Sequence, residues 1–383
     1  MRPMPAVPMP LTLGDLWRAC RRGRDARRRL EAEVADYHDA EAAFGISSGR
    51  AALWLALRAL RRTLPDRSRV IVPAWTCPTV GRSVQEAGLQ GLCADVSLDT
   101  LNIIPARVAE LIDDSVLAVI APHMFCVPCD AAALRDICRE RVVYFIEDCA
   151  QCVGGRWQGQ RVGTFGDVSF LSMGRSKNLR GYEGGVLWTN RSDLVEPLRE
   201  EFERLPDAPV GTKHKLRQAA ITVLSTPSLW AAAKRLPGLK VGAEDQGFDP
   251  HPSKLADWQA GLGLASLERL EEFNECRREL AGHLRDALTD AAGIRCQTVP
   301  DEAEPTCLRF ATLLTEGDAD QRDALVRELQ GVDIDARAFY ARPMREYEWW
   351  RASDGQSPDD HAREIVRRNV VLPLPHAANE AQI

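Results

Sequence analysis

Lys177 has the surroundings expected of a lysine that reacts with carbonyl compounds. It is the single lysine of residues 163–178, a stretch rich in glycine and hydroxyl side chains, and it follows a mostly apolar run. A lysine amine forms a Schiff base only when it is unprotonated, which requires desolvation or a neighbouring positive charge such as Arg175. Most lysines in folded proteins are exposed, so this segment alone leaves an ordinary surface lysine as the simpler alternative.

Residues 45–50 have the composition of a phosphate-binding helix start. Ser48, Gly49 and Arg50 directly precede an apolar helical pattern at residues 51–60. Free backbone N–H groups at a helix N-terminus, small side chains and an arginine together favour a bound phosphate. An ordinary serine N-cap followed by a glycine explains the pattern equally well.

Three further polar or aromatic residues occupy positions suited to a flat, charged ligand. Asp148 and Gln151 follow a predicted strand at residues 142–146. A carboxylate there can keep a heteroaromatic nitrogen protonated, and Gln151 could reach a ring hydroxyl. Trp75 follows a predicted strand at residues 70–73, where it could cover a ring or belong to the core. Ser172 lies close to Lys177 and offers a hydroxyl.

The cysteines suggest a competing site. Two CxxC pairs, Cys126 with Cys129 and Cys149 with Cys152, are separated by nineteen residues, which fits a four-cysteine zinc site. However, the intervening residues predict a helix at 131–139 and a buried strand, rather than the short turns of a zinc ribbon. We expect no metal, and we keep a zinc or iron–sulfur protein as an alternative.

Composition limits the class of protein. With 383 residues, 45% of them hydrophobic, the chain can bury a substantial core. The net charge of −6 argues against nucleic acid as a partner. Eleven cysteines in a chain of this size indicate a reducing compartment. We find neither an apolar run of about 18 to 20 residues nor a signal peptide, so we expect a cytoplasmic protein.

The element pattern predicts an α/β fold. Strands are predicted at residues 70–73, 116–120, 142–146 and 185–189, and helical patterns alternate with them. This alternation indicates a mainly parallel sheet, in which ligands collect at the carboxyl ends of the strands.

The pattern changes after residue 200, and we expect a large domain at residues 1–240 and a smaller α/β domain at residues 241–383. A long amphipathic helix at residues 258–284 should bridge them, followed by a strand at 307–314 and a helix at 318–329. An apolar helical segment at residues 216–239 could lie weakly on a membrane surface, or be buried against protein.

The chain resembles the DegT/DnrJ/EryC1/StrS family of pyridoxal-phosphate-dependent aminotransferases, mostly sugar aminotransferases of fold type I. The motifs that carry the resemblance keep the family's order and spacing: residues 47–53, 72–76, 147–151, 163–167, 170–178 and 183–186. The match begins near residue 30 and is strongest between residues 44 and 190.

The resemblance implies a role for each candidate residue. Lys177 would form the Schiff base with pyridoxal 5′-phosphate and move the proton, and Asp148 would pair with the pyridine nitrogen. Gln151 would contact the ring hydroxyl. The phosphate would be held by Ser48, Gly49, Arg50 and Ser172. The family usually has an aromatic residue where this chain has Cys77, so Trp75 is a candidate for ring stacking.

Two departures lie near the expected substrate site. The family's Asn-Tyr-Arg, whose Asn typically reaches the partner's phosphate across a homodimer, is replaced by residues 252–254, Pro-Ser-Lys. The family's His-Tyr-x-x-Pro appears at residues 339–343 as Phe-Tyr-Ala-Arg-Pro.

The resemblance implies a homodimeric aminotransferase that moves an amino group from an amino acid, typically glutamate, to a keto sugar or related ketone in glycan or natural-product biosynthesis. We expect a nucleotide-linked sugar. Some relatives are dehydratases, typically with histidine in place of the lysine; Lys177 therefore favours transamination, with dehydration of a sugar or cyclitol as the alternative.

Overall fold

The computed structural model describes residues 25–174, 176–208, 252–350 and 358–374, together with Gly14, Trp17, Ala19 and Gly23. The predicted apolar segment at 216–239 and the boundary between residues 240 and 241 lie outside the described residues. Both stay predictions.

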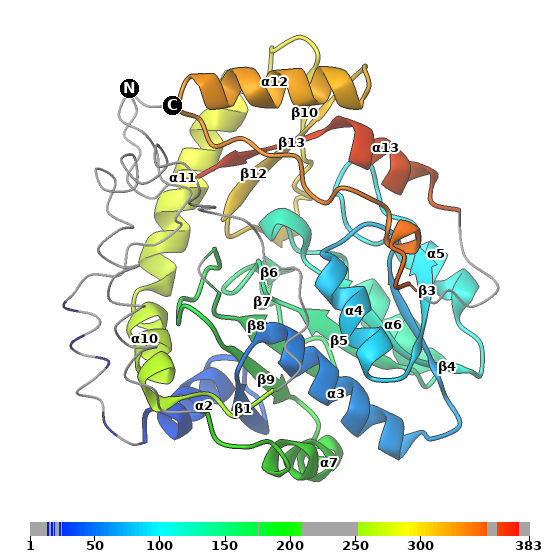
Figure 1. Cartoon of the computed structure of the whole chain (residues 1–383), viewed down its shortest axis with the longest axis vertical. Coiled ribbons are helices and arrows are strands. Elements are labelled where there is room, and N and C mark those ends of the chain that lie inside the picture. Colours follow the sequence, from blue (N-terminus) through cyan, green and yellow to red (C-terminus); the bar gives the residue numbers. More distant parts are fainter. Residues whose placement is uncertain are drawn as a thin grey trace.

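A seven-stranded sheet in the order β1-β9-β8-β5-β4-β2-β3 forms the centre of the molecule (Figure 1). Its strands are β1 (Ala42–Ile46), β2 (Arg69–Pro73), β3 (Gln90–Ala94), β4 (Val116–Pro122), β5 (Tyr144–Asp148), β8 (Val168–Ser172) and β9 (Gly185–Thr189). Within this described sheet, β9 runs antiparallel to both neighbours and the other pairs are parallel. The predicted α/β class with a mainly parallel sheet is confirmed. The carboxyl ends of β1, β2, β4, β5 and β8 therefore share one edge, which we call the carboxyl edge.

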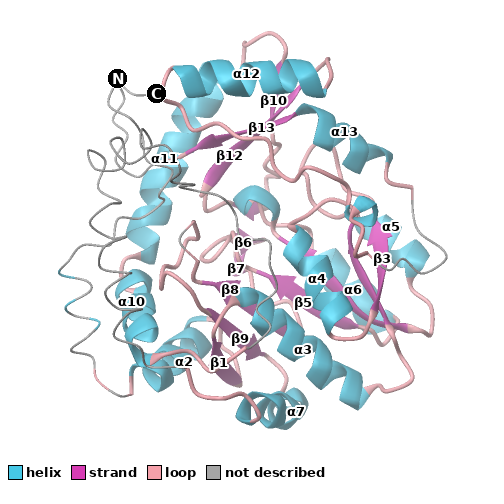
Figure 2. Ribbon diagram, viewed as in Figure 1, coloured by secondary structure: helices cyan, strands magenta, loops and turns pink. Residues whose placement is uncertain are grey.

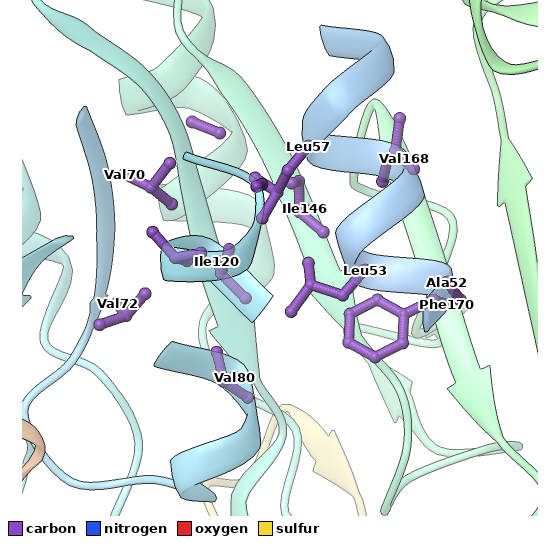
Figure 3. Packing of buried hydrophobic residues seen from close by; sticks show 14 of the residues in the cluster. Ala52, Leu53, Leu57, Val70, Val72, Val80, Ile120, Ile146, Val168 and Phe170 are labelled. Atoms are coloured by element: carbon purple, nitrogen blue, oxygen red, sulfur yellow. The ribbon is translucent and has the colours of Figure 1, made fainter. Parts of the chain in front are cut away.

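Helices cover both faces of this sheet (Figure 2). Their bounds are α2 (Ala26–Tyr37), α3 (Gly49–Thr63), α4 (Pro78–Glu86), α5 (Pro105–Leu111), α6 (Ala131–Glu140) and α7 (Ser192–Glu203). Helix α3 packs Leu53 and Leu57 toward strand residues such as Ile146 (Figure 3). Helices α5 and α6 pack on the opposite face. Apolar side chains on both faces account for the near-continuous hydrophobic strands.

A second sheet, in the order β10-β12-β13, lies beyond the first. It consists of β10 (Ile294–Cys296), β12 (Arg309–Leu314) and β13 (Asn369–Pro373), with α12 (Ala319–Gly331) and α13 (Asp360–Arg368) beside it (Figure 1). A small third sheet joins β11 (Ala303–Glu304) to β6 (Arg156–Trp157) and β7 (Gln160–Arg161). The short 3-10 helices are η1 (Met124–Cys126) and η2 (Met344–Glu346).

The prediction of one continuous helix at residues 258–284 was wrong. The chain forms two helices, α10 (Asp257–Leu267) and α11 (Leu270–Leu288), separated by Glu268 and Arg269. Ser266 Oγ accepts a hydrogen bond from Arg180 N and donates to Arg180 O, both at 3.2 Å, which ties the end of α10 to a loop of the large sheet. Helix α11 then continues toward the second sheet (Figure 1).

Candidate active site

The segment that the sequence predicts to bind phosphate lies at the carboxyl edge, between β1 and β8. Ser48 is the N-cap of α3, and its Oγ accepts a hydrogen bond from Ala51 N at 3.1 Å. The hydroxyl can still donate its own proton to a ligand. Gly49 and the half-buried Arg50 follow in the first helical turn, where backbone N–H groups have no intrahelical acceptor.

Two glycines allow this helix start to approach β8 and β9 closely. A Cβ at Gly49 would lie 2.9 Å from Ser172 Cβ. A Cβ at Gly185 would lie 2.7 Å from Gly49 N. Because both glycines lack Cβ, Ser172 and the N-terminus of α3 can lie side by side, as the sequence predicts for a phosphate site.

Asp148 ends β5 at the same edge. The strand begins two residues later than predicted, because Val142 adopts a φ of +56° and is 69% exposed. Asp148 is 7% exposed and accepts a hydrogen bond from Ala150 N at 2.9 Å. Burial raises the pKa of its carboxyl, and the positive charge of Lys177 acts in the opposite direction.

Lys177 therefore lies within electrostatic range of Asp148. It is half-buried, and its backbone N donates to Gly174 O at 3.2 Å. Gly174 N in turn donates to Ser172 Oγ at 3.4 Å. This turn places the lysine directly after the strand that carries Ser172.

Gln151 is buried more deeply than Lys177, with 6% of its surface exposed. Its Nε2 donates to Tyr340 Oη at 3.5 Å, and its Oε1 is buried with no hydrogen-bond partner among the described residues. An unpartnered buried carbonyl oxygen is costly unless something else, such as a ligand or water, satisfies it. Tyr340 lies in residues 339–343, where the sequence differs from the family's His-Tyr-x-x-Pro motif. It was not predicted as a site residue.

The structure does not support Trp75 as a cofactor-binding residue. Its side chain is 0% exposed, its Nε1 donates to Tyr340 O at 3.2 Å, and its ring packs against Phe125 and Tyr340. The indole therefore has no free face for a second ring. The position of Trp75 after β2 is compatible with covering a cofactor ring or with belonging to the core. Its complete burial favours the core.

Glu147, next to Asp148, holds the loop that leads to β8. Its carboxylate accepts hydrogen bonds from Gly163 N at 2.8 Å, Phe165 N at 2.8 Å and Gly166 N at 2.7 Å. His123 Nε2 is a further neighbour, 3.2 Å from Glu147 Oε1. The motif at 147–151 contains Glu147, but only the folded chain reveals this function.

The four CxxC thiols are not gathered into one group of possible metal ligands among the described residues. Among the described residues, the group of possible ligands within 4.8 Å of one another is His123, Glu147 and Cys149. Glu147 is already occupied by three backbone N–H groups. Burial raises the pKa of the Cys149 thiol to about 12 and also raises the pKa of the Cys126 and Cys152 thiols, as expected for cysteines in apolar surroundings. The geometry favours cysteines packed as small apolar residues.

Comparison with known proteins identifies the family. A model of the DegT/DnrJ/EryC1/StrS aminotransferase family matches residues 19–383. The chain belongs to this family. Its members are pyridoxal-phosphate-dependent aminotransferases, so the predicted family, enzyme class and cofactor are confirmed.

Several relatives of this aminotransferase have named activities. A GDP-perosamine synthase of Vibrio cholerae is 28% identical over 315 residues, covering 82% of this chain and 76% of that protein. An L-glutamine:2-deoxy-scyllo-inosose aminotransferase of Micromonospora echinospora is 30% identical over 318 residues, covering 80% and 69%. A dTDP-4-dehydro-2,6-dideoxy-D-glucose 3-dehydratase of Saccharopolyspora spinosa is 24% identical over 352 residues, covering 87% and 73%.

The fold has close structural counterparts. An aminotransferase of Helicobacter pylori, involved in pseudoaminic acid biosynthesis, superposes with a TM-score of 0.79 at 16% identity, covering 99% of this chain and 96% of that one. This similarity supports the fold class alone.

The donor set at the carboxyl edge fits pyridoxal phosphate. A helix N-terminus with two hydroxyls suits the phosphate, a buried carboxyl suits a protonated ring nitrogen, and an unpartnered amide oxygen lies close to them. A half-buried lysine completes the set.

Proposed function

We propose that this aminotransferase transfers an amino group from an amino acid, with glutamate as the first candidate, to a keto sugar, nucleotide-linked, or to a related cyclic ketone. The observation that carries the proposal is the placement of Asp148 at the end of β5 and of Lys177 shortly after the end of β8, at one edge of the sheet. Relatives named for a nucleotide sugar and for an aminated inosose support the acceptor class.

Each predicted residue has a distinct task in this proposal. Bound pyridoxal phosphate supplies an electron sink. The Nζ of Lys177 would hold the cofactor through its aldehyde, and the free amine would move a proton at the substrate carbon. Asp148 keeps the ring nitrogen protonated, and Gln151 contacts the ring hydroxyl. Ser48, Gly49, Arg50 and Ser172 hold the phosphate.

Dehydration is the second candidate, because one relative is named a dehydratase. The presence of Lys177 favours transamination, since the family's dehydratases typically have histidine at this position. The two functions give different products from one substrate: an amine, or a ketone that has lost water.

The test is to incubate the pyridoxal-phosphate-loaded protein with glutamate or glutamine and a panel of nucleotide-linked keto sugars and cyclitol ketones. Mass spectrometry should detect an amine that carries the donor nitrogen, and Lys177→Ala should abolish it. Loss of water from the acceptor without gain of nitrogen would replace the proposal by dehydration.

A homodimer is part of the proposal, although the segment that would reach the partner departs from the family. Here Ser253 bonds within its own chain: Ser47 N donates to Ser253 O at 2.9 Å, and Ser253 N donates to Ser47 Oγ at 3.1 Å. Sedimentation velocity of the loaded protein distinguishes a dimer from a monomer.

The cellular location stays a prediction. Among the described residues, none of the helices is both long enough and apolar enough to span a membrane. We propose a cytoplasmic enzyme. For segment 216–239 both alternatives are kept, weak association with a membrane surface or burial against protein, and flotation with anionic lipid vesicles distinguishes them.

A further inference from the structure

Residues 339–350, which we call the strap, run from the second sheet to the carboxyl edge of the first. Phe339 N donates to Asn369 Oδ1 of β13 at 2.8 Å, which fixes one end. Met344 N donates to Ala74 O at 2.7 Å, directly after β2. The strap therefore connects the two sheets beside the proposed cofactor site.

Tyr340 is the strap residue that reaches this site. Its Oη accepts a hydrogen bond from Gln151 Nε2 at 3.5 Å, and its carbonyl oxygen accepts one from Trp75 Nε1 at 3.2 Å. Its ring stacks on Phe125 with centroids 6.4 Å apart. The position of Tyr340 thus influences how the Gln151 amide is oriented.

Trp350, at the far end of the strap, is seated on two glycines. A Cβ at Gly91 of β3 would lie 1.9 Å from Trp350 Cη2, and a Cβ at Gly81 of α4 would lie 2.8 Å from Trp350 Cζ3. The Met344 side chain also packs against Gly81, since a Cβ at Gly81 would lie 2.5 Å from the Met344 sulfur. Glycine is unfavourable inside a strand or helix and typically marks the close approach of another group.

The seat is specific to one indole. Trp350 is 8% exposed, whereas its neighbour Trp349 is half-buried and packs its ring beneath the Arg82 guanidinium at 5.7 Å. Helix η2, which carries Met344, lies beside α4 (Figure 1). The strap is therefore fixed at both ends, with Tyr340 between them.

We propose that Trp350 and Tyr340 are positioning residues: the indole, seated on Gly81 and Gly91, fixes the strap so that Tyr340 orients Gln151 toward the ring hydroxyl of the cofactor. This inference rests on the proposed function, in which Gln151 contacts that hydroxyl. The Gln151 amide nitrogen carries two N–H groups: one donates to Tyr340 Oη, and the other would donate to the ring oxygen. A donated hydrogen bond favours the deprotonated form of that oxygen, and a displaced strap weakens this bond.

The test is a pH titration of the visible band of the bound cofactor, which needs neither donor nor acceptor. In Tyr340→Phe the midpoint should rise by about half a unit to one unit. Trp350→Ala should raise it similarly although Trp350 does not contact Gln151, and the double variant should show no further shift. Trp350→Phe should give a smaller shift of the same sign, and it replaces Trp350→Ala if that variant does not fold.

Glu348→Ala is the matched control, because it removes an exposed side chain of the same strap. It should leave the midpoint unchanged. Unchanged midpoints in Tyr340→Phe and both Trp350 variants, or an equal shift in Glu348→Ala, would overturn the inference. Variant midpoints that shift as predicted, while no ketone is aminated, would contradict the proposed acceptor and support the inference about the strap.

Discussion

Asn178, the residue after Lys177, donates a hydrogen bond from its Nδ2 to Asn274 Oδ1 of helix α11 at 3.4 Å. Asn274 Nδ2 donates in turn to Val153 O at 3.0 Å, shortly after Gln151. Both asparagines are fully buried. One side chain of α11 thus connects the loop of the reactive lysine to the loop that follows Asp148.

Removal of this connection should loosen both loops. Asn274→Ala leaves buried polar groups without a partner, so we expect a loss of about 1–3 kcal/mol of stability and weaker cofactor binding. Thermal unfolding and cofactor titration measure the two effects. The exposed neighbour gives the control: Glu275→Ala should change stability by less than about 0.5 kcal/mol. Equal effects of the two substitutions would argue against a special role for Asn274.

Asp148→Asn should have opposite effects on the cofactor-free and cofactor-bound protein. Because burial raises the pKa of Asp148 in the folded state, its contribution to stability is present at low pH and is lost as the pH rises through that raised pKa. Asparagine avoids the cost of a buried carboxylate. At pH 7 the cofactor-free variant should therefore unfold at a temperature equal to or above that of wild type, with the difference vanishing below about pH 4.

With cofactor present the order should reverse. Loss of the charge-assisted hydrogen bond to the ring nitrogen should weaken cofactor binding about 10- to 100-fold. Differential scanning fluorimetry with and without pyridoxal phosphate measures both states. A cofactor-free variant that is clearly less stable than wild type at pH 7 would show that the carboxylate itself supports the fold.

The close approach at Gly49 should be intolerant of a single methyl group. Gly49→Ala places Cβ against Ser172 and separates the helix start from β8, so we expect cofactor affinity to fall about tenfold, ~1.4 kcal/mol. Gly282 in α11 has no atom within 4 Å of its added Cβ. Gly282→Ala should stabilise the protein by about 0.5–1 kcal/mol and leave cofactor affinity unchanged. Unchanged affinity in Gly49→Ala would mean that the phosphate lies elsewhere.

Metal should have no structural role at the cysteine pairs. Because Glu147 is already bonded to backbone N–H groups and the four CxxC thiols are not gathered into one ligand group, purified protein should contain less than one zinc or iron atom per chain. Chelators should leave its unfolding temperature unchanged. Stoichiometric metal that is removed by chelation, together with a loss of stability, would support a metal site at the cysteine pairs.

The strands that sequence pattern predicts are those rich in β-branched residues, such as β2, β4 and β9. Strands β1 and β3 each contain a glycine and few β-branched side chains, and neither was predicted. Their pairing depends on neighbours distant in the sequence. The break between α10 and α11 has the same origin, since Ser266 bonds to Arg180 across the fold.

The candidate site also combines residues marked by local sequence pattern with residues placed by long-range contacts. Asp148 could be predicted because it follows a predicted strand, and parallel strands bring their carboxyl ends to one edge. Ser48 could be predicted from the pattern of a helix start, and Ser172 from its nearness to Lys177 in the sequence. Trp75 could not be assigned this way, because a core residue and a ring-covering residue occupy the same position after a strand. Asn274 and Tyr340 act through long-range contacts, which no periodicity marks.

The most direct test of the account is the visible absorption spectrum of purified protein with pyridoxal phosphate, before and after addition of glutamate. The account predicts a yellow band that bleaches with glutamate and is missing in Lys177→Ala. A band that persists in Lys177→Ala, or a wild-type protein that binds no pyridoxal phosphate, would contradict the assignment of Lys177 as the residue that carries the chemistry.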